Sequence, residues 1–135
     1  RPILIDTNAY TAFKLGDEAA LEVLAHADRI LLSTVVLGEL LGGFAAGSRE
    51  PWNRAELARF IDSPRVEIVA ISAQTADHYA LVYAGLRRKG QPIPTNDLWI
   101  AASTLEHGAA LLTQDVHFAQ IAGLRCGQTL ADFLP

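Results

Sequence analysis

The sequence predicts an α/β fold in which short parallel strands alternate with longer helices. Two observations carry this prediction. Short apolar runs, of the kind buried on both faces of a parallel sheet, alternate along the chain with segments whose apolar residues recur every three or four positions. No internal repeat or low-complexity stretch interrupts the alternation, and a length of 135 residues suits a single domain over residues 1–135.

Five segments are expected to form the strands. They are residues 2–5, 30–33, 66–71 and 109–113, with residues 125–128 as a fifth strand at the edge of the sheet. The first ends directly at Asp6, and the fourth is followed closely by Asp115.

Capping residues delimit the expected helices. Asp6-Thr7-Asn8 can turn the chain and begin a helix, Ser33 or Thr34 can cap the helix over 35–46, and Ser72 can cap a long helix that ends at Gly90. The other helices are expected over residues 19–27, from Asn53 to just before Pro64, from Thr95 or Asn96 to Gly108, and over 116–121.

Composition excludes several classes of protein. Half of the residues are hydrophobic and 19% are charged, so neither a disordered nor a fibrous chain is expected. No run of 18 or more apolar residues indicates a membrane span. The single cysteine, Cys126, has no partner for an internal disulfide, and no His/Cys cluster has zinc spacing, which fits a reducing compartment such as the cytoplasm.

The charge balance is acidic, with 11 basic and 15 acidic residues and a net charge of −4. A protein that binds DNA without regard to sequence is usually basic. A cluster of carboxylates that binds metal cations makes the net charge more negative, even in a protein whose substrate is a phosphate bound through the metal. The distribution of the acids along the chain is therefore more informative than the net charge.

Four acids are the candidates for chemistry: Asp6, Glu39, Asp97 and Asp115. Asp6 and Asp115 follow strands whose carboxyl ends share one edge of a parallel sheet, where ligands bind in open α/β folds. Glu39 lies about one turn inside its helix and leans back toward the same edge, and Asp97 lies in the first turn of another helix.

Each acid also has a structural interpretation. Asp6 and Asp115 can serve as helix caps, and Asp97 can favour the positive end of its helix dipole. Glu39 can lie on a solvated helix face, although it stands among Val36, Leu37 and Leu40, where an unpaired carboxylate is costly.

The conjunction of the four acids favours a metal site. Carboxylates gathered at one edge repel one another and raise each other's pKa, and a divalent cation removes that cost. Oxygen ligands without His or Cys suit Mg²⁺ or Mn²⁺. Such an ion acidifies a bound water and binds phosphodiester oxygens, so hydrolysis of a phosphodiester is the expected chemistry.

The segments around the acids resemble the four acidic motifs of PIN-domain ribonucleases, and most closely those of VapC-type toxins of bacterial toxin–antitoxin modules. The four segments are LIDTN at 4–8, LGELLGG at 37–43, NDLWIAA at 96–102 and LLTQDVHF at 111–118. Their order, spacing and flanking residues agree over nearly the whole chain, including the segment 121–124.

This resemblance implies a PIN-like three-layer α/β/α sandwich with a short central parallel sheet. It also implies a Mg²⁺- or Mn²⁺-dependent endoribonuclease whose metal and catalytic residues are Asp6, Glu39, Asp97 and Asp115. Three neighbouring polar residues match positions that support the acids or metal-bound water in the family: Thr7, Asn8 and Thr113. Relatives often carry a further acid where this chain has His117, so we expect His117 to be a polar neighbour of the site and not a ligand.

The resemblance further implies a homodimer and a cognate VapB-type antitoxin whose C-terminal segment covers the site. The helices over Val35–Phe44 and Ala55–Ile61 are apolar enough to form a groove for it, although core packing explains the same residues.

The RNA substrate calls for basic and aromatic contacts. Arg87, Arg88 and Lys89 form the only dense basic run, and they serve either phosphate contact or the end of their helix. Scattered candidates are Arg49, Arg54, Arg59 and, for stacking on a base, Trp52, whereas Trp99 is expected in the core.

Two other Mg²⁺-dependent classes fail on sequence. A phospho-accepting receiver needs an acid after its third strand, where this chain has Ala70-Ile71-Ser72, and a haloacid-dehalogenase phosphatase needs an acid where Asn8 stands. The alternative that remains is a PIN-fold nuclease of RNA processing or DNA repair outside a toxin–antitoxin module.

Overall fold

The centre of the molecule is a five-stranded sheet, described here from a computed structural model that covers residues 1–134. Its strands are β1 (Ile3–Ile5), β2 (Ile30–Ser33), β3 (Val66–Val69), β4 (Ala110–Leu112) and β5 (Cys126–Gly127). They lie in the order β3-β2-β1-β4-β5, and every neighbouring pair is parallel.

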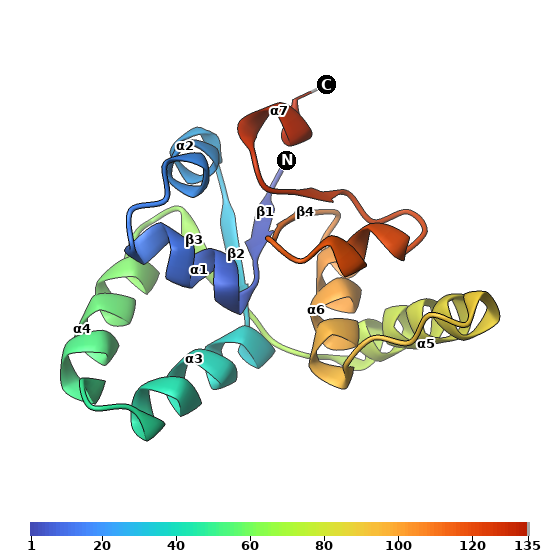
Figure 1. The fold of residues 1–135 in the computed structure, drawn as a ribbon, viewed down its shortest axis with the longest axis horizontal. Helices are drawn as coiled ribbons and strands as arrows, with labels where there is room; N and C mark the ends of the chain where they lie inside the picture. The colour runs from blue at the N-terminus through green and yellow to red at the C-terminus, as the bar shows by residue number, and fades with distance from the viewer. Residues whose placement is uncertain (135) are drawn as a thin grey trace.

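The helices connect these strands. They are α1 (Thr7–Lys14), α2 (Glu18–His26), α3 (Thr34–Ala46), α4 (Glu50–Ile61), α5 (Ala73–Lys89), α6 (Thr95–Glu106), the 3₁₀ turn η1 (Val116–Gln120) and α7 (Leu130–Phe133). Figure 1 shows α1, α2 and α4 on one side of the sheet and α5 and α6 on the other. The three-layer α/β/α arrangement is therefore confirmed.

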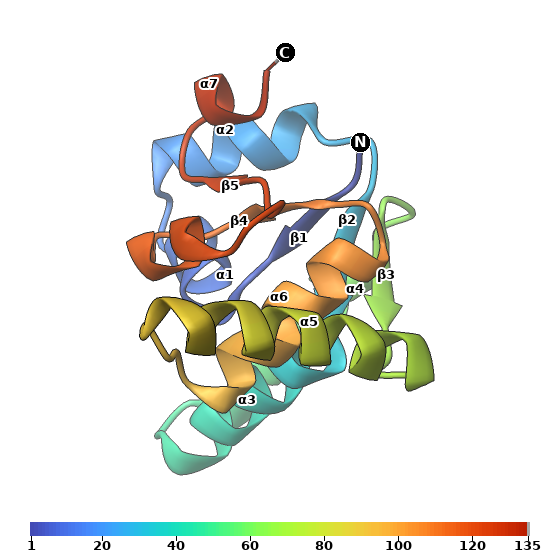
Figure 2. The ribbon, with the colours of Figure 1, turned by 90° about the vertical axis from the view of Figure 1, so that its right-hand side faces the viewer.

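The layers explain why the central strands are apolar throughout. All residues of β1, β2 and β4 are buried, because helices cover both faces of the sheet at these strands. The edge strand β3 is mostly exposed. In Figure 2 the helices α5 and α6 lie in front of the strands, packed against each other.

Capping side chains begin the helices as the sequence predicts. Ser33 accepts a hydrogen bond from the backbone N–H of Val36 at the start of α3, and Ser72 forms a capping box with Thr75 at the start of α5. Gly90 ends α5 in the left-handed conformation, at φ +67°, which a residue with a side chain rarely adopts.

Some expected boundaries are wrong. Asn53 does not begin α4, because the helix starts at Glu50 with a proline in its first turn and Asn53 lies inside it. The strand expected over 66–71 ends at Val69, since the chain leaves the sheet there to reach the Ser72 cap. Within residues 1–134, no helix is long and apolar enough to cross a membrane.

Two glycines provide a matched test of the packing. A Cβ at Gly127 in β5 would stand 2.3 Å from the Cβ of Asp132, whereas a Cβ at Gly43 in α3 meets no atom within 4 Å. We expect Gly127→Ala to lower the free energy of unfolding by about 1–3 kcal/mol through overpacking. Gly43→Ala should raise it by about 0.5–1 kcal/mol, because alanine is the better helix former.

Chemical denaturation of both variants checks this pair. Equal stability of Gly127→Ala and the unmodified protein would mean that the segment after β5 yields without cost and is not packed as described.

Candidate active site

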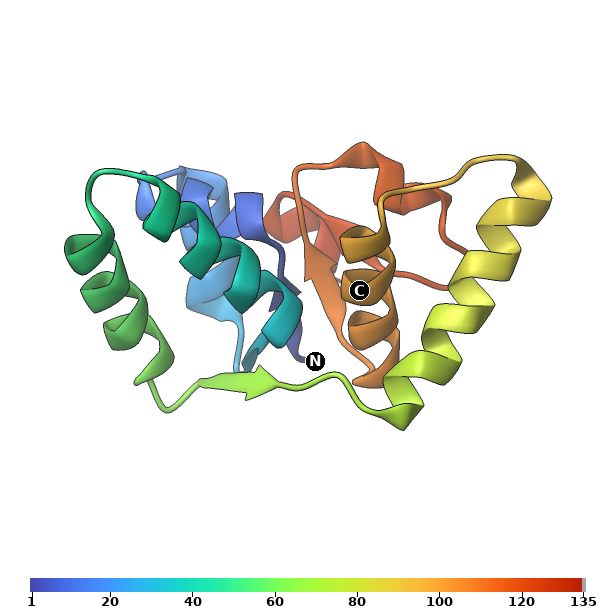
Figure 3. The same cartoon turned by 90° about the horizontal axis from the view of Figure 1, so that it is seen from below.

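The four candidate acids come from four elements that meet where β1 and β4 end. Asp6 follows β1, Asp115 follows β4 by three residues, Glu39 lies on α3, and Asp97 lies in the first turn of α6. Figure 3 views the molecule from this side, with α3 and α6 on either side of the ends of the central strands. The two helices contact each other, so Glu39 and Asp97 face the same space.

Asp6 is the most buried of the four, with 6% of its surface exposed. One carboxylate oxygen, Oδ1, accepts a hydrogen bond of 2.8 Å from the backbone N–H of Ala9 and thereby caps α1, while Oδ2 accepts one from the hydroxyl of Thr113. Asp6 therefore caps a helix and faces the site at the same time.

Burial raises the pKa of Asp6 above its ordinary value. The hydrogen bonds from Thr113 and Ala9 lower this pKa, and the negative charges of Asp115 and Glu39 raise it. The two hydrogen-bond donors therefore offset only part of the cost of removing this carboxylate from water.

Thr113 links the two strand-end acids. Its buried hydroxyl donates to Asp6 and accepts a hydrogen bond of 3.0 Å from the backbone N–H of Asp115. Asp115 in turn caps η1, because its Oδ1 accepts from the backbone N–H of His117 at 2.9 Å and lies 2.7 Å from Nδ1 of the same histidine.

Glu39 is held at both of its carboxylate oxygens. Oε1 accepts a hydrogen bond from the hydroxyl of Thr7 on α1, and Oε2 accepts one of 3.1 Å from the side-chain amide of Asn96 on α6. This carboxylate therefore joins three helices at the edge of the sheet. The interpretation of Glu39 as an unpartnered residue on a solvated face of α3 is therefore wrong.

Asp97 shows the electrostatic cost of the arrangement. Burial, followed by the charges of Asp115, Glu39 and Asp6, raises the pKa of Asp97 from 3.8 to about 6. The charge of His117 acts in the opposite direction. The four acids are near enough to repel one another, which is the expected signature of a site that binds positive charge.

The carboxylates do not converge on a single point. Among residues 1–134, no three His, Cys, Asp or Glu side chains are placed to hold one ion as they stand. The donor chemistry, oxygen atoms with mutual repulsion, fits a hard divalent cation, and the half-buried Glu39, Asp97 and Asp115 are not locked in a closed core.

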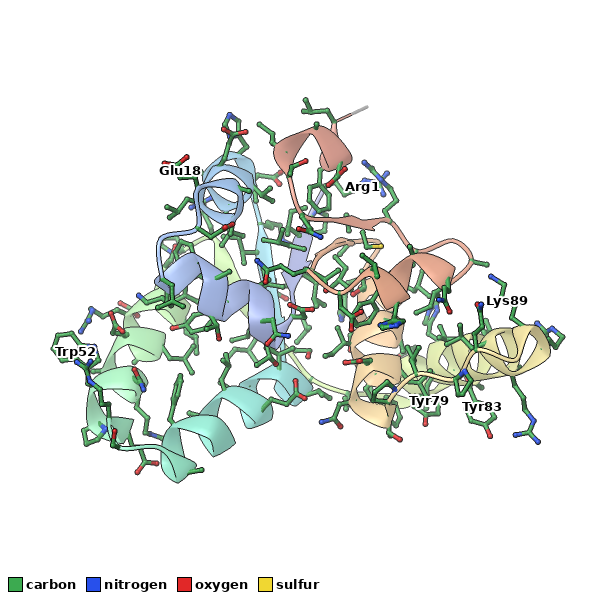
Figure 4. All side chains as sticks on the ribbon, in the orientation of Figure 1. Arg1, Glu18, Trp52, Tyr79, Tyr83 and Lys89 are labelled. Carbon is green, nitrogen blue, oxygen red and sulfur yellow. The ribbon has the colours of Figure 1, made fainter. Side chains whose placement is uncertain are left out.

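The other expected residues divide into two groups. Thr7 and Thr113 bond directly to the acids, whereas Asn8 is exposed on α1. Of the basic run, Arg87 contacts the hydroxyl of Tyr83 at 3.4 Å, and Lys89 donates to the carbonyl oxygen of Gln120 at 2.6 Å. Figure 4 shows Lys89 on the opposite side of α5 from Tyr79 and Tyr83.

The aromatic candidates are placed as follows. Trp52 is exposed, with the guanidinium of Arg49 over its ring at 5.4 Å. Trp99 is half-buried and packs on Tyr79, with ring centroids 4.2 Å apart, so it belongs to the packing of α5 on α6.

Asn96 is a site residue that sequence reasoning missed. The sequence suggests Thr95 or Asn96 only as a helix start; α6 begins at Thr95, as predicted, and the amide of Asn96 donates to Glu39. The only indication of this role in the sequence is that Asn96 directly precedes Asp97 in the segment 96–102.

Comparison with known proteins identifies the family of this chain. The sequence model of the PIN domain family matches residues 3–124, so the chain belongs to the PIN domain family. It is 33% identical over 126 residues to ribonuclease VapC2 of Rickettsia felis, covering 90% of this chain and 92% of the relative. It is 35% identical to ribonuclease VapC4 of Mycobacterium tuberculosis, covering 65% and 68%. Within the family it is a member of the VapC ribonucleases, and thus a nuclease.

A solved structure gives the same result in three dimensions. The fold matches a chain of VapBC2 from Rickettsia felis, bound in that crystal to a DNA fragment from its promoter. The TM-score is 0.83 at 28% sequence identity, and the match covers 96% of this chain and 99% of the other.

The raised pKa of Asp97 predicts a pH-dependent effect of its removal. Because the folded-state pKa is about 6 and the ordinary value is 3.8, the folded protein binds this proton more tightly, and Asp97 destabilises the fold as pH rises from about 4 to 6. Asp97→Asn should therefore raise the free energy of unfolding in metal-free buffer at pH 7.5, by about 1 kcal/mol at most since water screens a half-exposed group. The gain should vanish near pH 4.

Urea denaturation at the two pH values, in the presence of EDTA, measures this difference. Glu18→Gln is the matched control, because Glu18 is an exposed acid in the first turn of α2, where its neutralisation should lower stability through the helix dipole. If Asp97→Asn also lowers the free energy of unfolding, the favourable interaction of Asp97 with its helix dipole outweighs the repulsion from the other acids.

Proposed function

We propose that this protein is the endoribonuclease toxin of a toxin–antitoxin module and hydrolyses RNA phosphodiester bonds at the edge where β1 and β4 end. The observation that carries the proposal is the meeting of Asp6, Glu39, Asp97 and Asp115 from four separate elements, at mutual electrostatic cost. Folds tolerate such a cost where function requires it.

A divalent cation, Mg²⁺ or Mn²⁺, fits this set of oxygen donors. Asp6, Asp97, Asp115 and Glu39 are the residues that would hold it. When bound, such a cation lowers the pKa of water and neutralises charge on the phosphate.

The chain's own residues prepare the site. Thr113 and the backbone N–H of Ala9 fix the orientation of Asp6, and His117 fixes that of Asp115. Thr7 and Asn96 hold Glu39 between α1 and α6. These bonds restrain the orientation of Asp6, Asp115 and Glu39 before substrate binds.

RNA contacts are proposed for Arg87 and Arg88. Arg87 shares a side of α5 with Tyr83, to which it is bonded, whereas the ammonium of Lys89 is engaged by Gln120 on the other side. Lys89 is therefore the weakest of the three candidates for phosphate binding.

The partners are proposed from the relatives. Structural neighbours of this chain include VapBC assemblies, from Rickettsia felis and from Haemophilus influenzae. A VapB-type antitoxin is proposed here on that ground. A homodimer and a single PIN domain over residues 1–135 are proposed from membership of the PIN domain family, and a place in the cytoplasm from the single cysteine. The proposed groove for the antitoxin segment is formed by α3 and α4, whose partly buried apolar residues include Leu41, Phe44 and Phe60.

Cleavage by acid-to-amide variants tests the function. Asp6→Asn and Asp97→Asn should reduce cleavage of single-stranded RNA in Mn²⁺ by at least about 100-fold while the fold is retained. Asp28→Asn is the control, because Asp28 is an exposed acid before β2, at the opposite edge of the sheet. EDTA should abolish cleavage by the unmodified protein, and cleavage of DNA in preference to RNA would instead support the repair nuclease.

Asn96 provides a second test that does not remove a carboxylate. Asn96→Ala leaves Oε2 of Glu39 without its donor, and we expect a loss of roughly 10–100-fold in cleavage together with a smaller thermal shift on addition of Mn²⁺. Asn53→Ala, in α4 and outside the site, is the control. An unchanged rate and thermal shift in Asn96→Ala would make its bond to Glu39 purely structural.

A further inference from the structure

A small hollow lies beside the first turn of α6, on the side of α5. It is enclosed by the last turns of α5, the connecting segment 90–94 and Leu98, and its volume is about 220 Å³. Pockets for drug-sized ligands measure roughly 300–1,000 Å³, so this hollow suits a single ring system.

The walls combine an aromatic face with apolar groups. Tyr83 is 47% exposed, and its ring is stacked on that of Tyr79, with centroids 6.3 Å apart and an interplanar angle of 12°. Tyr79 is fixed in turn by Trp99. Pro92, Ile93 and Leu98 supply the remaining apolar surface. The half-exposed Tyr83 is therefore a supported ring with area left to contact a ligand.

One charged group completes the hollow. Arg87 lies one helical turn after Tyr83, and its Nη1 lies 3.4 Å from the hydroxyl of Tyr83, so the guanidinium stands at the rim of the ring. A guanidinium presents several donors in a planar fork and carries a permanent positive charge. It selects a ligand whose ring edge offers two acceptors side by side.

The hollow adjoins the candidate active site through α6. The same helical turn places Asn96 and Asp97 toward Glu39 and Leu98 into the hollow. Figure 4 shows Tyr79 and Tyr83 projecting from α5 to one side, the side on which α6 begins. Residues that face the acids, Asn96 and Asp97, and a residue that lines the hollow, Leu98, are thus consecutive in the chain.

We propose that this hollow is a subsite for an unpaired guanine base of the RNA, next to the phosphate that is cleaved. Tyr83 stacks on the base, and Arg87 donates to O6 and N7, the two acceptors that guanine presents on one edge. The inference rests on the proposed function, because it takes single-stranded RNA as the substrate, and it adds a preference for base identity.

Binding of short oligonucleotides tests the subsite without cleavage. Fluorescence anisotropy in EDTA compares a labelled uridine heptamer that carries one central guanosine with the same heptamer carrying adenosine. We expect the unmodified protein to bind the guanosine heptamer about tenfold more tightly, the discrimination of one bidentate contact. Equal affinity for the two heptamers overturns the proposal.

Three variants separate the contributions. Tyr83→Ala should weaken binding of both heptamers by about tenfold through lost stacking, and Tyr83→Phe should restore it. Arg87→Lys should keep the salt dependence and lose the preference for guanosine, because the charge stays and the fork is lost. Arg88→Ala, which does not line the hollow, should weaken binding of both heptamers equally.

Two further measurements distinguish the alternatives. Light scattering of Tyr83→Ala reports the molecular mass; if this variant dissociates a dimer and Arg87→Lys keeps the guanosine preference, the surface is a contact between copies and the proposal is wrong. Cleavage of RNA of mixed sequence is followed in parallel with Mn²⁺. Cleavage without preference for guanosine overturns the subsite alone, whereas guanosine-selective binding without any cleavage supports the subsite and overturns the proposed nuclease site.

Discussion

The pairing of β1 with β4 is the constraint on which the rest of the site depends. It brings together residues 107 positions apart, so that Thr113 donates to Asp6 and holds the backbone N–H of Asp115. Both strands are buried on both faces, and a slip of one residue in their register would exchange the side chains packed on the two faces and separate Asp6 from Thr113. The same packing that stabilises the sheet therefore fixes the relative height of two of the acids.

Structural and chemical roles coincide in these acids. Asp6 caps α1, and Asp115 caps η1, yet each also faces the other acids. A cap stabilises its helix by satisfying a backbone donor, and this restrains the side chain in one orientation at the edge of the sheet. The question of cap or ligand therefore has no single answer for Asp6 and Asp115. In each of them Oδ1 serves the helix, while Oδ2 of Asp6 accepts from Thr113 and keeps a second lone pair.

Polar contacts at this edge join helices from the two sides of the sheet. Glu39 joins α1, α3 and α6 through Thr7 and Asn96, and Asp97 stands in the same electrostatic field. Like charges in partly buried positions oppose folding, and the buried apolar sheet offsets that opposition. The result is an edge that is held rigidly by its neighbours and that favours positive charge.

The sequence by itself determined the fold class, the parallel strands, most of the caps and the four acids, because hydrophobic periodicity and capping are local properties of a few consecutive residues. Helix boundaries were predicted less well where two possible starts lie close together. The sequence predicts that α4 begins at Asn53, but the helix begins at Glu50, with Pro51 in its first turn. Only the tertiary structure decided the partners of each acid. That the amide of Asn96 reaches Glu39, that Thr113 donates to Asp6, and that Lys89 donates to Gln120 all depend on which elements meet in space. Such contacts join residues far apart in the chain, and no local pattern records them.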